Sequence, residues 1–186
     1  MKHILPALAL LALSLNTHGG QQNDVTAAKS AIKEFAGALQ GELKTAMQAG
    51  GPVAAIGVCN TQAPQIAEEV STAHGMNLSR VSLKNRNPGN VPSEWQTAVL
   101  EKFEARKAAG EDVGSLVWSE TASVDGGQEF RFMKAIPTGG ICLTCHGVTI
   151  APDVKQQLAV LYPEDRATGF SEGDIRGAFV VTKSLD

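Results

Sequence analysis

The chain has 186 residues, of which 43% are hydrophobic and 19% are charged, and its formal net charge at pH 7 is −3. A chain of this length can bury a core of its own and is typical of one domain. The mildly acidic composition argues against nucleic acid as a partner and against adhesion to anionic lipid, because both attract basic surfaces.

Residues 1–19 have the pattern of a secretory signal peptide. Lys2 is basic, an apolar run covers residues 4–15, and the small residue Gly19 suits cleavage. The apolar run is shorter than the roughly 20 residues that span a membrane, although an uncleaved anchor is the alternative. We therefore expect an exported, periplasmic protein that is soluble after cleavage, with residues 20–186 as a single domain.

Helical periodicity dominates the next part of the chain. Residues 24–49 carry apolar side chains at steps of three, four or seven, and the Gly-Gly-Pro that follows ends this long helix. Helices over 52–58 and 64–74 come next, so we expect Cys59 at a break between two helical pieces. The apolar face of the long helix suits either the core of one chain or the seam of a homodimer.

The rest of the chain alternates strands, turns and helices. Strands are predicted over residues 78–83, from 116 onward, over 129–136 and over 176–183, and helices over 93–109 and 153–162. An Asp-Gly-Gly turn joins the second and third strands. This order of elements predicts an α+β fold, in which a small antiparallel sheet is flanked by helices and preceded by a long N-terminal helix.

The most informative stretch is GGICLTCHG at residues 139–147, which contains Cys142, Cys145 and His146. Cys-x-x-Cys-His is the attachment signature of c-type haem. Each thiol adds to one haem vinyl group, and the adjacent histidine is placed to bind the iron. We therefore expect one covalently attached haem c, with Cys142 and Cys145 as the attachment sites and His146 as an axial ligand of the iron.

Three other chemistries use the same residue types. A thioredoxin-like site also contains Cys-x-x-Cys, but it belongs to a βαβ unit and needs no histidine. A zinc site could combine the two motif cysteines with Cys59 and with His146 or His74, although zinc frameworks usually show two paired clusters of ligands. A disulfide between Cys142 and Cys145 is the third alternative. The leader and the adjacent histidine favour haem.

The residues alone leave the second axial position open. Haem attachment would leave Cys59 as an unpaired thiol in an oxidising compartment, and a thiolate ligand would favour ferric iron. A buried cysteine, however, is more often a small apolar residue of the core. The competing ligands are Met47, Met76, Met133 and His74, and an open site is a further alternative.

Three stretches together resemble a known family: AAIGVCNTQAPQIAEEVS at 54–71, RVSLKNRNPGNVPSEWQTAVLEKF at 80–103 and CLTCHG at 142–147. In this order they resemble exported mono-haem c-type proteins with a PAS-like fold, long labelled a domain of unknown function. That family includes a photosystem II-associated haem protein and sensor regions joined to signalling modules. The resemblance implies a PAS-like sheet, haem on the two motif cysteines, and His146 and Cys59 as the axial ligands.

The stretch over residues 80–87, which covers the end of the first predicted strand and the start of the loop after it, is a candidate for binding the haem propionates. It contains Arg80 and Arg86, and a guanidinium offers forked donors that match a carboxylate. The alternative is a solvated basic loop, since exposed charges usually contribute little.

These observations predict a haem-based sensor of redox state or of a small ligand such as NO or CO, because thiol ligation is labile. The alternative is a periplasmic electron carrier that exchanges electrons with a redox partner protein. We expect no fused kinase or cyclase, and no enzymatic activity. A peroxidase would need an open iron and a distal acid–base group, and nothing in the sequence marks His74 for that role.

Overall fold

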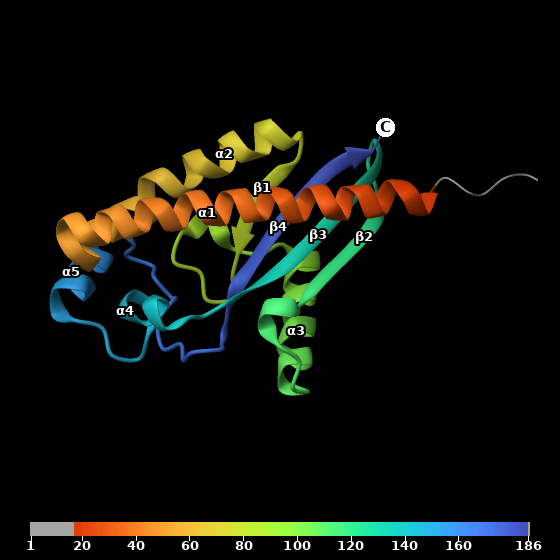
Figure 1. Cartoon of the computed structure of the whole chain (residues 1–186). Coiled ribbons are helices and arrows are strands. Elements are labelled where there is room, and N and C mark those ends of the chain that lie inside the picture. Colours follow the sequence, from red (N-terminus) through yellow and green to blue (C-terminus); the bar gives the residue numbers. More distant parts are fainter. Residues whose placement is uncertain (1–16, 186) are drawn as a thin grey trace, which may run out of the picture.

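The computed structural model describes residues 17–185. The predicted leader therefore lies outside the described residues, except for its last three, which begin the first helix. A four-stranded antiparallel sheet forms the centre of the molecule (Figure 1), with strand order β1-β4-β3-β2. The strands are β1 (Asn77–Val81), β2 (Val117–Val124), β3 (Gly127–Pro137) and β4 (Ile175–Leu185).

The long helix α1 (Thr17–Gly57) crosses one face of this sheet (Figure 1). It begins earlier than the sequence predicted, and it bends sharply at Gly50 and Gly51, where the predicted stop lies. Its apolar side chains are core: Ile32, Phe35 and Leu39 pack with residues of β3 and β4. The sequence left core and dimer seam as alternatives, and this packing assigns the face to the core of one chain.

The chain does not break at Cys59, so that prediction is wrong. Helical backbone continues from α1 through a π turn at Val58–Gln62 into α2 (Ala63–His74). In this turn the Ala63 amide donates to the Val58 carbonyl, five residues back. Pro64 explains the wider turn, because a proline ring clashes with the carbonyl four residues earlier in an α-helix. Cys59 therefore lies on a widened helical turn.

The second face of the sheet is covered by α3 (Glu94–Ala108), from which Val99, Leu100 and Phe103 are buried against Met133 and other sheet residues. Ser93 caps α3 through a capping box with Gln96. This agrees with the start of the helix predicted at residue 93. The turn before β3 and the last two strands also lie where predicted. The predicted α+β arrangement is confirmed.

The final helix, α5 (Pro152–Leu161), packs under the bend between α1 and the π turn. Val154, Leu158 and Tyr162 bury Ile56 in a small separate cluster. This cluster joins the C-terminal third of the chain to the helical segment that carries Cys59. Within residues 17–185, no helix combines the length and the apolar character needed to cross a membrane.

One glycine of β4 permits the close contact between β4 and β1. A Cβ atom on Gly177 would collide with the backbone carbonyl oxygen of Val81, and backbone cannot rotate away as a side chain can. We predict that Gly177→Ala lowers the free energy of unfolding by about 2 kcal/mol, as overpacking does. Urea denaturation of the full chain measures this change.

The matched control is Gly37→Ala on the exposed side of α1, where a Cβ would meet nothing within 4 Å. Alanine in a helix interior should raise the free energy of unfolding by about 0.5–1 kcal/mol. Equal effects of the two substitutions would contradict the tight β1–β4 contact.

Candidate functional site

The Cys-x-x-Cys-His motif forms a compact helical unit after β3. The chain passes through a 3-10 turn at Gly140–Cys142 and enters the short helix α4 (Leu143–His146). This places Cys142, Cys145 and His146 within about one helical turn of one another. All three cysteines of the chain are free thiols and are half-buried.

The motif is held by the segment that precedes β4. The amides of Gly169 and Phe170 donate to the carbonyls of Gly147 and His146, at 3.1 and 3.0 Å. Gly147 must be small here, because a Cβ atom would lie 2.6 Å from the backbone oxygen of Leu143. The motif is therefore fixed by backbone hydrogen bonds from residues that lie 22 and 24 positions downstream of their partners.

The ring of His146 is oriented by a single strong contact. Its Nδ1 lies 2.7 Å from the Ala167 carbonyl oxygen. A carbonyl only accepts, so Nδ1 carries the proton and Nε2 keeps a free lone pair. Burial, together with the charges of Arg176, Arg86 and Arg80, lowers the pKa of His146 to about 3. The imidazole is thus neutral at pH 7 and presents Nε2 as a ligand atom.

Arg86 joins the motif to the same downstream segment. It is 7% exposed. Its Nε donates to the Asp165 carboxylate at 3.0 Å, and its Nη2 donates to the carbonyls of Cys145 and Ala167 at 2.6 and 3.2 Å. Three acceptors inside the protein therefore bind the guanidinium, and Nη1 is left for another partner.

Two further arginines lie beside the motif. Arg80 extends from β1, with its guanidinium 5.2 Å from the ring centre of Phe35. Burial lowers the pKa of Arg80, and the charge of Cys59 raises it. Arg176, at the start of β4, donates from Nε to His146 Nε2 at 3.4 Å. The sequence did not identify Arg176 as a site residue, because an arginine at the end of a strand belongs to no recognisable motif.

Cys59 faces this same cluster from the π turn. Burial raises the pKa of its thiol above the ordinary value. The charges of Arg80, Arg86 and Arg176 act to lower that pKa. The same three arginines act on His146. Because interactions between charges weaken with distance, Cys59 and His146 lie around one shared group of arginines, although 87 residues separate them in the chain.

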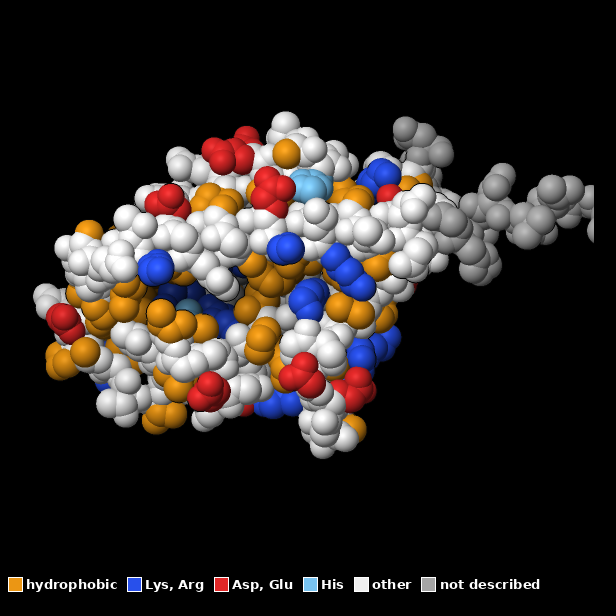
Figure 2. Space-filling view, viewed as in Figure 1, with side chains coloured by type: hydrophobic (Ala, Val, Ile, Leu, Met, Phe, Trp, Pro, Cys, Tyr) orange, Lys and Arg blue, Asp and Glu red, His pale blue; other side chains and the backbone are white. Residues whose placement is uncertain are grey.

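A hollow in the surface opens onto this group. Figure 2 shows it between α1 and α4, with basic side chains and a histidine at its base and hydrophobic side chains around its rim. Burial raises the pKa of the Cys145 thiol, and the charge of Cys59 raises it further. The Cys59 and Cys145 thiols are therefore near each other. The structure thus brings all six predicted site residues to one region.

Three of the four competing side chains have other surroundings, namely His74, Met76 and Met133. His74 is bonded to Glu34 Oε2 at 2.9 Å, between α2 and α1. Met76 is buried in the core under α1, and Met133 is buried on the α3 side of the sheet. Met47 is half-buried on α1. Among residues 17–185, no three His, Cys, Asp or Glu side chains are placed to hold one metal ion.

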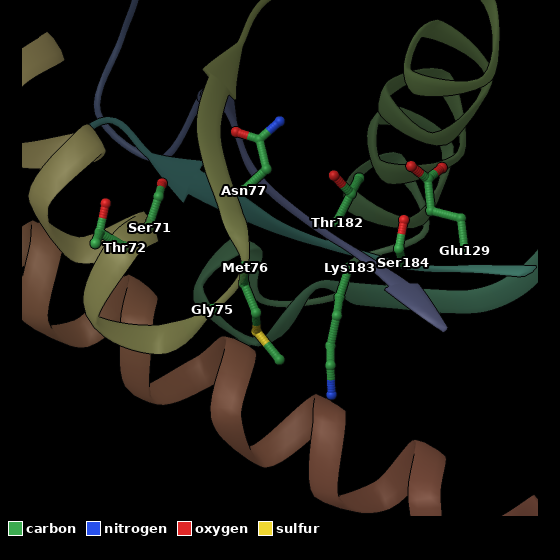
Figure 3. Close-up of a pocket in the computed structure, with 9 residues that line it drawn as sticks. All are labelled: Ser71, Thr72, Gly75, Met76, Asn77, Glu129, Thr182, Lys183 and Ser184. Carbon is green, nitrogen blue, oxygen red and sulfur yellow. The ribbon is translucent and has the colours of Figure 1, made fainter. Parts of the chain in front are cut away.

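A second hollow lies at the far end of the sheet. It has a volume of about 440 Å³ and is open to solvent. Figure 3 shows Lys183 pointing from it toward α1, while Thr182 and Ser184 point to the other side. Since Lys183 and Arg176 are seven residues apart on β4, this hollow is roughly 20 Å from the motif. It takes no part in the site. The residues that line it are Ser71, Thr72, Gly75, Met76, Asn77, Glu129, Thr182, Lys183 and Ser184.

Comparison with known proteins identifies the protein family to which this chain belongs. The Tll0287-like family, described as Tll0287, matches residues 17–184, so the chain belongs to that family. The crystal structure of the cyanobacterial heme-protein Tll0287 is similar to this chain, with a TM-score of 0.63 and 23% sequence identity. The match covers 90% of this chain and 96% of that one, and at this identity it shows a shared fold. A search of the curated proteins found no match.

The contacts of Arg86 give a direct test of how the motif is held. We predict that Arg86→Met lowers the free energy of unfolding by about 3–5 kcal/mol, because it leaves Asp165 buried without its partner. Urea denaturation measures the loss. The double variant with Asp165→Asn should recover part of it, since the amide oxygen still accepts from the Ala167 amide. Equal losses in both variants would show that the buried ion pair contributes nothing.

Proposed function

We propose that this chain is an exported, periplasmic protein with one haem c, attached at Cys142 and Cys145 and bound through its iron by His146. The support is the compact motif, in which the two thiols and the imidazole come from three residues within about one helical turn. The hydrogen bond to Ala167 leaves the lone pair of His146 on Nε2, where it accepts from Arg176 in this structure and could bind a metal instead. The structurally similar Tll0287 is itself a heme-protein by its name.

The residues around the motif suit this cofactor. Haem is a flat apolar ring with two carboxylates. The hollow between α1 and α4 has hydrophobic side chains around its rim and positively charged side chains at its bottom (Figure 2). Arg80 and Arg86 stay the predicted partners of the propionates, and Arg86 has Nη1 available for this purpose. When bound, the haem supplies a one-electron redox centre whose iron can also take small ligands.

The observation that carries the function is the position of Cys59. Its thiol, on the π turn, and the His146 imidazole, on α4, both lie close enough to Arg80, Arg86 and Arg176 for the charges of these arginines to act on their pKa values. We propose that Cys59 is the second axial ligand. Burial raises the pKa of the Cys59 thiol and the arginine charges offset only part of that rise, so iron would bind Cys59 with loss of the thiol proton. The Ala167 carbonyl fixes the imidazole ring and increases its basicity.

Such a site suits a sensor of redox state or of small ligands. A thiolate balances the charge of ferric iron and binds ferrous iron less well. With haem bound, Cys59 would be the ligand that reduction weakens, and the iron would then supply a binding position for NO or CO. The change would be transmitted through the helical segment that joins Cys59 to α1 and α2. This proposal includes no enzymatic turnover.

Electron transfer is the second candidate, and exposed apolar side chains favour it. Ile141 and Val148 flank the motif and are 75% and 76% exposed. Apolar contacts beside a redox centre suit brief encounters with a redox partner protein. A carrier would keep the same two iron ligands in both oxidation states, whereas the proposed sensor would not.

The test compares wild type with Cys59→Ser after maturation with haem. We predict a low-spin ferric EPR and absorption spectrum typical of thiolate ligation in the wild type, and its loss in Cys59→Ser. Met47→Leu is the matched control, because Met47 is the half-buried competitor on α1, and it should leave the spectrum unchanged. Identical spectra for wild type and Cys59→Ser would contradict the assignment of Cys59.

Carbon monoxide then separates the two candidate functions. Ferrous wild type should bind CO readily if Cys59 leaves the iron on reduction. A ferrous protein that stays six-coordinate and excludes CO would contradict the sensor and favour the electron carrier. Wild type without any Soret band after haem maturation would contradict both.

A further inference from the structure

Arg176 occupies the one position on His146 that a metal needs. Its Nε donates to His146 Nε2 at 3.4 Å, while Nδ1 of the same ring is bonded to Ala167. A neutral imidazole has a single lone pair in the ring plane, and here it is on Nε2. That lone pair can accept from Arg176 or bind iron, but it cannot do both.

The guanidinium is held in place from its other side. Its Nη1 donates to Ser82 Oγ at 3.1 Å and to the Lys84 carbonyl at 3.2 Å, and it lies 5.4 Å from the ring centre of Phe170. These contacts do not depend on His146. If iron takes Nε2, the Arg176 side chain stays tethered through Nη1 while its Nε–H loses an acceptor.

Arg176 is half-buried, and a cationic donor that loses its acceptor in such surroundings costs free energy unless another partner replaces it. The surroundings are rich in positive charge. Burial lowers the pKa of Arg176, the charges of Arg86 and Arg80 lower it further, and Asp165 and Cys59 oppose them. Asp165 is already bonded to Arg86. A haem would bring two carboxylates, and one of them could replace His146 as the acceptor for Arg176.

We propose that Arg176 is the residue that selects a porphyrin with free carboxylates: it orients His146 in the empty site and pairs with a haem propionate in the filled one. This inference rests on the proposed function. It adds a residue from the start of β4 to the predicted partners of the propionates, and it gives that residue a role before the cofactor arrives.

The test uses the full chain produced without haem maturation, with its thiols reduced. It is titrated with ferric haemin and, separately, with haemin dimethyl ester, whose propionates carry no charge, and the Soret band is followed. Wild type should prefer haemin over the ester. Arg176→Met should weaken haemin binding by about tenfold to a hundredfold, which is the size of a lost charge-assisted hydrogen bond. Its affinity for the ester should equal or exceed that of wild type.

Arg166→Met is the matched control, because Arg166 is an exposed arginine on the segment that holds His146. It should leave both affinities unchanged. Arg176→Lys should retain part of the preference for haemin. If Arg176→Met does not fold, Ser82→Ala removes one tether of the guanidinium and should produce a smaller loss of the same preference.

Equal losses for haemin and the ester would show that Arg176 only supports the shape of the site, and unchanged haemin binding would show that it has no role. Either result overturns the proposal. A wild type that binds both porphyrins equally also overturns it, while leaving the proposed function intact. A wild type that binds neither contradicts the proposed function itself, and the role of Arg176 with it.

Discussion

The hydrogen bond between His146 Nδ1 and the Ala167 carbonyl is the contact on which the site depends. It sets the tautomer of the imidazole, turns Nε2 toward the arginines and ties α4 to the segment before β4. Arg86 strengthens the same connection, because it donates to carbonyls on both sides of it. A motif of five residues cannot orient its own histidine, and in this chain a segment about twenty residues away does so.

The sheet explains how Cys59 reaches the same place. Both faces of the sheet are packed, by α1 on one side and α3 on the other, so the sheet is a fixed base. The bend at Gly50 and Gly51 turns the helical chain back along α1, and the π turn beyond it carries Cys59. Burial of Ile56 against α5 joins this turn to the C-terminal third. A site built from such separate segments is suited to transmitting a change at one ligand to the long helix.

Much of the fold could be predicted because its signals are local. Apolar periodicity located the strands and helices, and Ser93 marked the start of α3. The π turn was missed because a proline in a helical pattern was interpreted as a restart, whereas Pro64 is accommodated by a wider turn. Arg176 was missed because its meaning comes only from the register that places it beside His146. The three-dimensional contacts between distant segments leave no periodic pattern in the sequence.

X-ray absorption at the iron edge tests the central claim, that Cys59 and His146 bind one iron from opposite segments of the chain. The measurement uses ferric wild-type protein matured with haem, and it identifies the atoms directly bonded to the iron. The account predicts one sulfur ligand together with nitrogen ligands from the porphyrin and from His146. An iron surrounded by nitrogen or oxygen alone would contradict it, and would leave Cys59 as a buried thiol beside the arginines.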